Sequence, residues 1–138
     1  MLSRTGDYEL DDEPSRLQPD LIWNFLSTQA YWGTWRQRED LRRQLTGSYL
    51  NLGCYGPDGA QVGFARVVSD GVALAYLADV FVLPAHRGRG LGHGLVDFAL
   101  AHGPSWRWLL HTKDAHGLYA GHGFGPPDGS YLERPARR

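Results

Sequence analysis

The chain lacks several features that mark whole classes of protein. Cys54 is the only cysteine among 138 residues, so no disulfide can form within the chain. No apolar run approaches the roughly 20 residues of a membrane-spanning helix. The N-terminal segment 1–14 has no apolar core of the signal-peptide kind. We therefore expect a cytoplasmic protein that does not act on membranes.

Positive charge is also scarce and scattered. Lys113 is the only lysine, and 14 basic residues face 15 acidic ones, which gives a formal net charge of −1. The arginines form no basic tract, so the sequence does not favour a nucleic-acid partner. The six histidines include no H-E-x-x-H or other recognised ligand spacing, and we expect no metal.

The length and a hydrophobic content of 42% suit one compact domain over residues 1–138. Apolar periodicity and turn residues predict ten elements. They are strands at 7–10, 48–55, 60–68, 72–83, 106–111 and from 124, and helices beginning near 21, 35, 90 and 115. The strands at 72–83 and 106–111 flank a helix and should be parallel. We expect an α/β fold, with a mixed sheet covered by helices on both faces.

Four glycines alternate in the turn after the strand at 72–83: Gly88, Gly90, Gly92 and Gly94. Glycine is costly inside regular structure. At a turn that leads into a helix, however, bare backbone N–H groups can cradle a phosphate. A P-loop would need a lysine here, and none precedes Lys113. A dinucleotide fingerprint would need a third glycine where this chain has His93 or Leu95.

Two segments instead carry a family resemblance. Residues 87–92 read R-G-R-G-L-G, directly after V-F-V-L-P, and resemble the R-x-x-G-x-G acetyl-CoA-binding motif of the GNAT N-acetyltransferases. Residues 114–124, D-A-H-G-L-Y-A-G-H-G-F, resemble the family segment A-x-x-L-Y-x-x-x-G-F. The specific evidence covers 72–124, and the element order and length of the whole chain fit the family.

The resemblance implies a GNAT fold in which two parallel strands splay apart and bind acetyl-CoA. The backbone of Phe81 and Val82 would pair with the pantetheine arm, as an added strand does. The turn would hold the pyrophosphate through its residues Arg87, Gly88, Arg89, Gly90, Leu91 and Gly92. For the two arginine side chains, the alternative is a solvated turn. Thr112 stands where many members have an asparagine near the pantetheine, and a hydroxyl supplies only part of an amide's hydrogen bonding.

Two residues are candidates for the chemistry. Tyr119 matches the family's general acid, since a phenol with a pKa of about 10 can protonate a leaving thiolate. The alternative is a core aromatic on a helix face. Asp79 is the only charge in the strand at 72–83. It is either a general base whose pKa is raised by burial, or a structural carboxylate that binds backbone amides at a bulge.

The acceptor side of the site is indicated by the aromatic segment A-Y-W-G-T-W at 30–35. Tyr31 and Trp32 are expected to form an apolar or cation-binding wall. The alternative is that these rings anchor the helical hairpin to the sheet.

Together these features imply acetyl transfer from acetyl-CoA to a primary amine of a small molecule or peptide, by direct attack in a ternary complex. Two alternatives stay open. A non-catalytic acyl-CoA-binding domain of the same fold is disfavoured by Tyr119. An RNA-binding arginine-glycine segment is disfavoured by the near-neutral charge. Because dimers are common in the family, the resemblance is also compatible with a homodimer.

Overall fold

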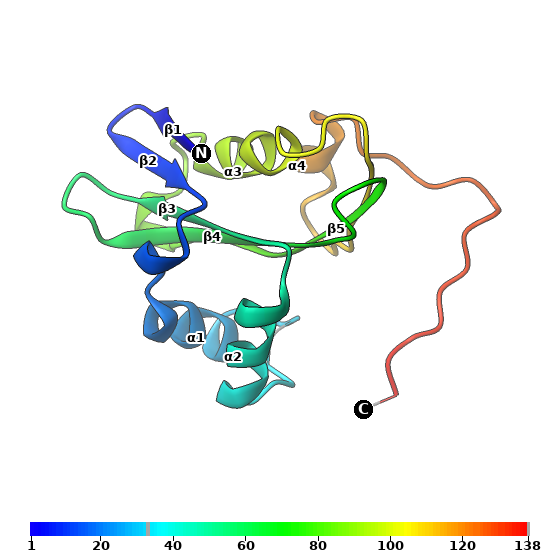
Figure 1. Ribbon diagram of the computed structural model, residues 1–138, viewed down its shortest axis with the longest axis horizontal. Coiled ribbons are helices and arrows are strands. Elements are labelled where there is room, and N and C mark those ends of the chain that lie inside the picture. The colour runs from blue at the N-terminus through cyan, green and yellow to red at the C-terminus, as the bar shows by residue number, and fades with distance from the viewer. Residues whose placement is uncertain (33, 138) are drawn as a thin grey trace.

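The computed structural model describes residues 1–32 and 34–137, so Gly33 of the aromatic segment lies outside the described residues. The strands form one six-stranded sheet with the order β1-β2-β3-β4-β5-β6 (Figure 1). They are β1 (Leu2–Thr5), β2 (Tyr8–Asp11), β3 (Leu50–Tyr55), β4 (Gln61–Ser69), β5 (Leu74–Val82) and β6 (Arg107–Leu109). Neighbouring strands are antiparallel, except that β5 and β6 are parallel. The predicted mixed sheet is confirmed.

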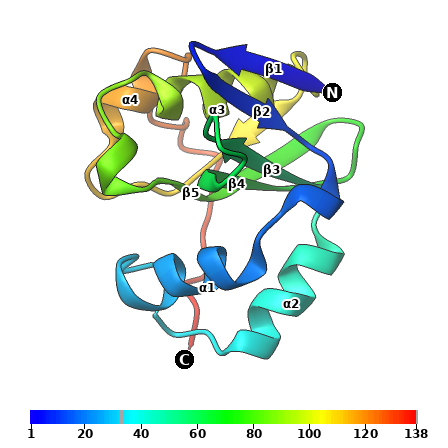
Figure 2. The same ribbon diagram turned by 90° about the vertical axis from the view of Figure 1, so that its left-hand side faces the viewer.

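Helices cover both faces of the sheet, as predicted (Figures 1 and 2). On one face lie α1 (Pro19–Thr28) and α2 (Arg38–Gly47), and on the other lie α3 (Leu91–Leu100) and α4 (His116–Ala120). Two short 3-10 turns, Pro14–Arg16 and Pro84–His86, join strands to helices. None of the helices in the described part of the chain is long and apolar enough to span a membrane.

Three local predictions were wrong. The chain begins with β1, which pairs with β2 through a turn at Gly6, where φ is +59°. β1 has a single apolar residue and so shows no apolar alternation. Helix α1 begins at Pro19 rather than near residue 21, in keeping with the preference of proline for the first turn. Within residues 121–137, no strand forms at Phe124, and the two prolines that follow lack donors for a sheet.

The sheet separates two apolar clusters. The larger one packs α3 against the inner residues of β3, β4 and β5, and includes Cys54 and Leu91. The smaller one packs α1 and α2 against the opposite face, where Phe81 stacks on Phe25 with ring centroids 4.1 Å apart. Both faces of β5 are covered. Its backbone groups can therefore be open to a ligand only along the strand edge, near its end and its bulge.

The parallel pair separates after three residues. Pairing joins Leu74, Ala75 and Tyr76 to β6, and within the described chain it extends no further along β5. Residues 77–82 therefore have a strand neighbour on one side only, which is β4. This opening between the carboxyl ends of β5 and β6 positions the site described next.

Candidate active site

A β-bulge in β5 turns the Asp79 side chain toward α1 and α2. Phe64 of β4 faces Phe81 and Arg66 faces Ala78, so two residues of β5 oppose one of β4 at this point. Asp79 has φ of +55°, the left-handed region that side chains other than glycine rarely adopt. Bulges of this kind re-aim a side chain next to a site.

The Asp79 carboxylate is fully engaged. Its Oδ1 accepts hydrogen bonds from Trp32 Nε1 at 3.1 Å and from Arg36 at 2.7 Å. Its Oδ2 accepts from Arg36 at 2.9 Å and from Arg66 Nε at 2.9 Å. A carboxylate offers about four lone-pair positions, and all are used here. We call Asp79, Arg36 and Arg66 the arginine cluster.

The pKa of Asp79 is lowered overall, so the expectation of a raised pKa is wrong. Burial is the largest single influence and does push that pKa upward, because Asp79 is only 6% exposed. The hydrogen bonds and charges of Arg36 and Arg66 together outweigh it and hold the pKa below its ordinary value. The bulge that we considered for Asp79 is confirmed, but guanidinium and indole groups take the place of the expected backbone amides.

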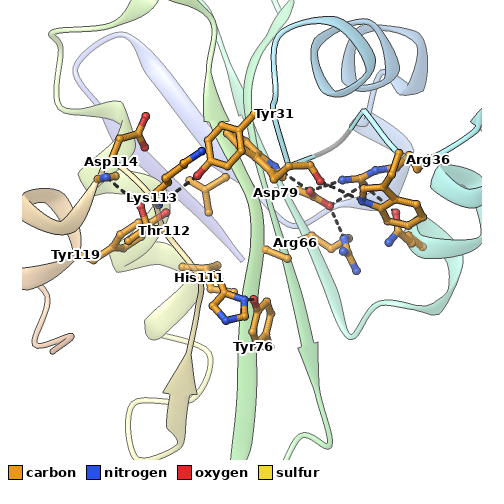
Figure 3. Close-up of a pocket in the computed structure, with 17 residues that line it drawn as sticks. Tyr31, Arg36, Arg66, Tyr76, Asp79, His111, Thr112, Lys113, Asp114 and Tyr119 are labelled. Atoms are coloured by element: carbon orange, nitrogen blue, oxygen red, sulfur yellow. Dashed lines mark hydrogen bonds and ion pairs between the residues drawn. The ribbon is translucent and has the colours of Figure 1, made fainter. Parts of the chain in front are cut away.

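A cavity of about 730 Å³ lies over the arginine cluster (Figure 3). It is bounded by the loop between α1 and α2, by β5, and by the segment between β6 and α4. Its lining residues are Tyr31, Trp32, Trp35, Arg36, Gln44, Arg66, Tyr76, Leu77, Ala78, Asp79, Val80, His111, Thr112, Lys113, Asp114, Ala115 and Tyr119. We call it the inner cavity. Both predicted aromatic wall residues line it, and Thr112 lies here too.

A groove of about 640 Å³ runs from the same place along the glycine turn. It brings together most of the residues predicted to bind acetyl-CoA: Phe81, Val82, Arg87, Gly88, Gly90, Leu91 and Gly92. We call it the turn groove. Arg89 is not among the residues that line either space.

Two of the four glycines are required by the backbone of the turn. Gly88 and Gly90 have φ of +79° and +78°, and Gly90 is the N-cap of α3. A Cβ built at either position meets no atom within 4 Å, so the space beside both is open. Glycine therefore permits the left-handed conformation and leaves the amides of the turn accessible.

Arg87 occupies an unexpected place. Its Nε donates a hydrogen bond to the Val82 carbonyl at 2.9 Å, instead of extending from the turn. One of the two lone pairs of the Val82 carbonyl is therefore taken within the chain.

Tyr119 lies where the two spaces meet. It lines both, together with Tyr31, Trp32, Val80, Asp114 and Ala115. Burial raises the pKa of Tyr119, and the nearby Tyr31 and Asp114 raise it further. The phenol therefore stays protonated. Its ring also packs edge-on against Phe124, with centroids 5.8 Å apart, so it belongs to the core as well.

Tyr31 connects the two walls of the inner cavity. Its hydroxyl accepts a hydrogen bond from the Lys113 backbone N–H at 3.1 Å, and the Lys113 ammonium lies 5.2 Å from its ring centre (Figure 3). Its neighbour Trp32 binds Asp79, so the aromatic segment is fixed to both the sheet and the segment before α4.

Sequence reasoning missed both arginines of this site. Arg36 follows the aromatic segment in a polar stretch that carries no distinguishing signal. Arg66 did carry one, because it is the only charge in the predicted strand at 60–68, as Asp79 is in the next strand. Two lone charges on neighbouring strands indicate a buried ion pair.

The candidate site contains no evident metal centre. Across residues 1–32 and 34–137, no three His, Cys, Asp or Glu side chains lie close enough together to hold an ion.

Known proteins are similar to this chain in sequence and in fold. A family model described as an acetyltransferase (GNAT) domain matches residues 53–126. A candidate acetyltransferase of Gibberella zeae is 30% identical over 135 aligned positions, which cover 83% of this chain and 76% of that protein. A crystal structure of a candidate GNAT acetyltransferase from Xanthomonas campestris is 41% identical, with a TM-score of 0.84, and covers 94% of this chain and 93% of its own.

A more distant structure shares the fold alone. A Mycobacterium tuberculosis protein crystallised with CoA is 22% identical, with a TM-score of 0.68, and the match covers 87% of this chain and 73% of that one. The family model and the relatives show that the chain belongs to the GNAT acetyltransferase family. It is an acyltransferase.

Proposed function

We propose that this chain transfers an acetyl group from acetyl-CoA to a primary amine of a small molecule or peptide. The observation that carries the proposal is the position of Tyr119, at the junction of the turn groove and the inner cavity. A donor in the groove and an acceptor in the cavity would meet there, which permits direct attack in a ternary complex.

The turn groove suits the donor. Open amides at Gly88 and Gly90, at the start of α3, form a cradle for a pyrophosphate. The open edge of β5 at Val82 offers backbone groups to an extended amide-containing arm. Acetyl-CoA supplies the activated thioester, and these residues would hold it with its sulfur toward Tyr119.

We assign Tyr119 the role of general acid. Its protonated phenol would donate to the sulfur as the thiolate leaves. We assign Asp79 a positioning role, because its carboxylate has no free lone pair to accept a proton from the amine. It fixes Trp32 and Arg36, and with them the wall of the inner cavity.

Calorimetric titration with acetyl-CoA tests the proposal, with NAD as the comparison ligand. We expect micromolar binding of acetyl-CoA and none of NAD, followed by free-thiol release when primary amines are added. Absence of binding to any coenzyme A species would overturn it. A desulfo-CoA titration keeps binding separate from slow hydrolysis of the thioester.

A further inference from the structure

The arginine cluster carries an excess of buried positive charge. Arg36 and Arg66 supply two guanidinium charges against the single carboxylate of Asp79, and Arg36 is only 5% exposed. The nearest further partners, Gln44 and Ser48, are neutral. Uncompensated charge at a half-enclosed site is expensive and attracts a counter-ion.

The cluster also has unused donors. An arginine offers five N–H groups. Those of Arg66 reach Asp79 and Ser48, and its remaining terminal nitrogen donates no hydrogen bond within the described chain. Arg36 Nε is buried and has no hydrogen-bond partner among the described residues. Both arginines line the inner cavity, so their positive charge borders the space where an acceptor would lie; the buried Arg36 Nε is not accessible to a ligand, whereas Arg66 keeps a terminal nitrogen without a partner in the described chain.

The other end of the inner cavity carries a carboxylate beside the Lys113 ammonium. Asp114 lies with Tyr119 on one side, and the arginine cluster lies on the other (Figure 3). Asp114 also lines the turn groove, so this residue lies next to the junction where an attacking amine must sit. Each end of the cavity therefore holds one carboxylate, and the arginine cluster, with two guanidinium groups on Asp79, is the end with excess positive charge.

We propose that the acceptor is an amine that also carries an anionic group, either a carboxylate or a phosphate. The inference rests on the proposed acetyl transfer and names its substrate class. The ammonium would approach Asp114 and Tyr119, and the anion would bind the free N–H groups of Arg66. Lys113 adds a third cation to the lining, against the two carboxylates of Asp79 and Asp114. A polyamine would place its second cation against the arginine cluster and be rejected.

Matched ligand pairs test this in wild-type protein. Because Trp32 and Trp35 line the inner cavity, tryptophan fluorescence reports binding directly, whether or not acetyl transfer follows. One pair is L-phenylalanine and 2-phenylethylamine, which differ by a carboxylate. The other is O-phosphoethanolamine and ethanolamine, which differ by a phosphate. We expect the anionic member of at least one pair to bind about 10- to 100-fold more tightly, the range of a charged hydrogen bond. The pair that responds identifies the anion.

The outcomes separate this inference from the proposed function. An anion preference in binding without thiol release from acetyl-CoA would support the substrate class and contradict the transfer. Thiol release with equal kcat/KM for both members of each pair would support the transfer and overturn the substrate class. Failure of every probe to change the tryptophan fluorescence would also overturn the proposed substrate class.

Variants then identify the residues that bind the anionic and the ammonium ends of the acceptor. Arg66→Gln should weaken the anionic member about 10-fold and leave the neutral member within about twofold. Asp114→Asn, at an exposed position, should weaken both members equally. The matched control is Arg42→Gln, an arginine of α2 that is 66% exposed, pairs with Glu39 and does not line the cavity. If Arg66→Gln proves unstable, the wild-type comparison still decides the proposal.

Discussion

The Arg36 guanidinium donates hydrogen bonds to both oxygens of the Asp79 carboxylate, at 2.7 and 2.9 Å, although the two residues are 43 positions apart in the chain. This pair joins the loop before α2 to the bulge in β5. Both side chains are almost fully buried, so loss of either partner would disturb the wall of the inner cavity. Its consequences for stability and for catalysis can be measured separately.

Asp79→Asn should destabilise the protein by about 3–5 kcal/mol, because it leaves two buried guanidinium groups without a counter-charge. Urea unfolding measures the change. The matched control is Asp7→Asn, an exposed aspartate in the β1–β2 turn, which should stay within about 0.5 kcal/mol of wild type. Turnover of Asp79→Asn across a pH series tests the alternative. If the variant is stable and its turnover no longer rises with pH as that of wild type does, Asp79 is instead the general base.

The same pair should make stability depend on acidity. The folded-state pKa of Asp79 lies below its ordinary value of 3.8. Its stabilisation is therefore complete above about pH 4 and is lost as the pH falls through the folded pKa. Urea unfolding from pH 6 down to pH 2 should show a steeper acid loss in wild type than in Asp79→Asn. Equal slopes would contradict the ion pair.

Local signals predicted much of the fold. The apolar run of β5, the glycine turn and the start of α3 follow one another in the chain, so periodicity and turn chemistry suffice to place them. The parallel pairing of β5 with β6 then followed from the handedness of the connection. The splay between them was expected only because of the family resemblance.

Contacts between side chains far apart in the chain could not be predicted from the sequence. Nothing near Arg36 indicates that it folds onto Asp79, because the bulge that aims Asp79 depends on the register of β5 with β4. That contact reverses the direction of the pKa shift expected from burial alone. The start of α2 was also misplaced: the helix begins at Arg38 rather than near residue 35, and Gln37 and Asp40 form its capping box.

Gly90→Ala should weaken acetyl-CoA binding about 10-fold or more, because a Cβ would stand where the turn approaches the pyrophosphate. The positive φ of +78° adds a stability cost of about 1–2 kcal/mol. Gly59→Ala separates the two effects, since Gly59 has φ of +83° and open space around its Cβ, but lies in the β3–β4 turn. Equal loss of affinity in both variants would show that strain alone is responsible.

Tyr119→Phe should lower turnover about 100-fold or more, the usual contribution of a positioned acid, while acetyl-CoA affinity changes less than about twofold. The ring contact with Phe124 is kept, so the melting temperature should hold as well. Steady-state kinetics and calorimetry on the same preparation measure both quantities. Tyr49→Phe, a half-exposed tyrosine that lines neither the inner cavity nor the turn groove, is the control. The hydroxyl is the only group removed by this substitution. Full activity in Tyr119→Phe would therefore assign the protonation of the sulfur to solvent and leave Tyr119 a packing role.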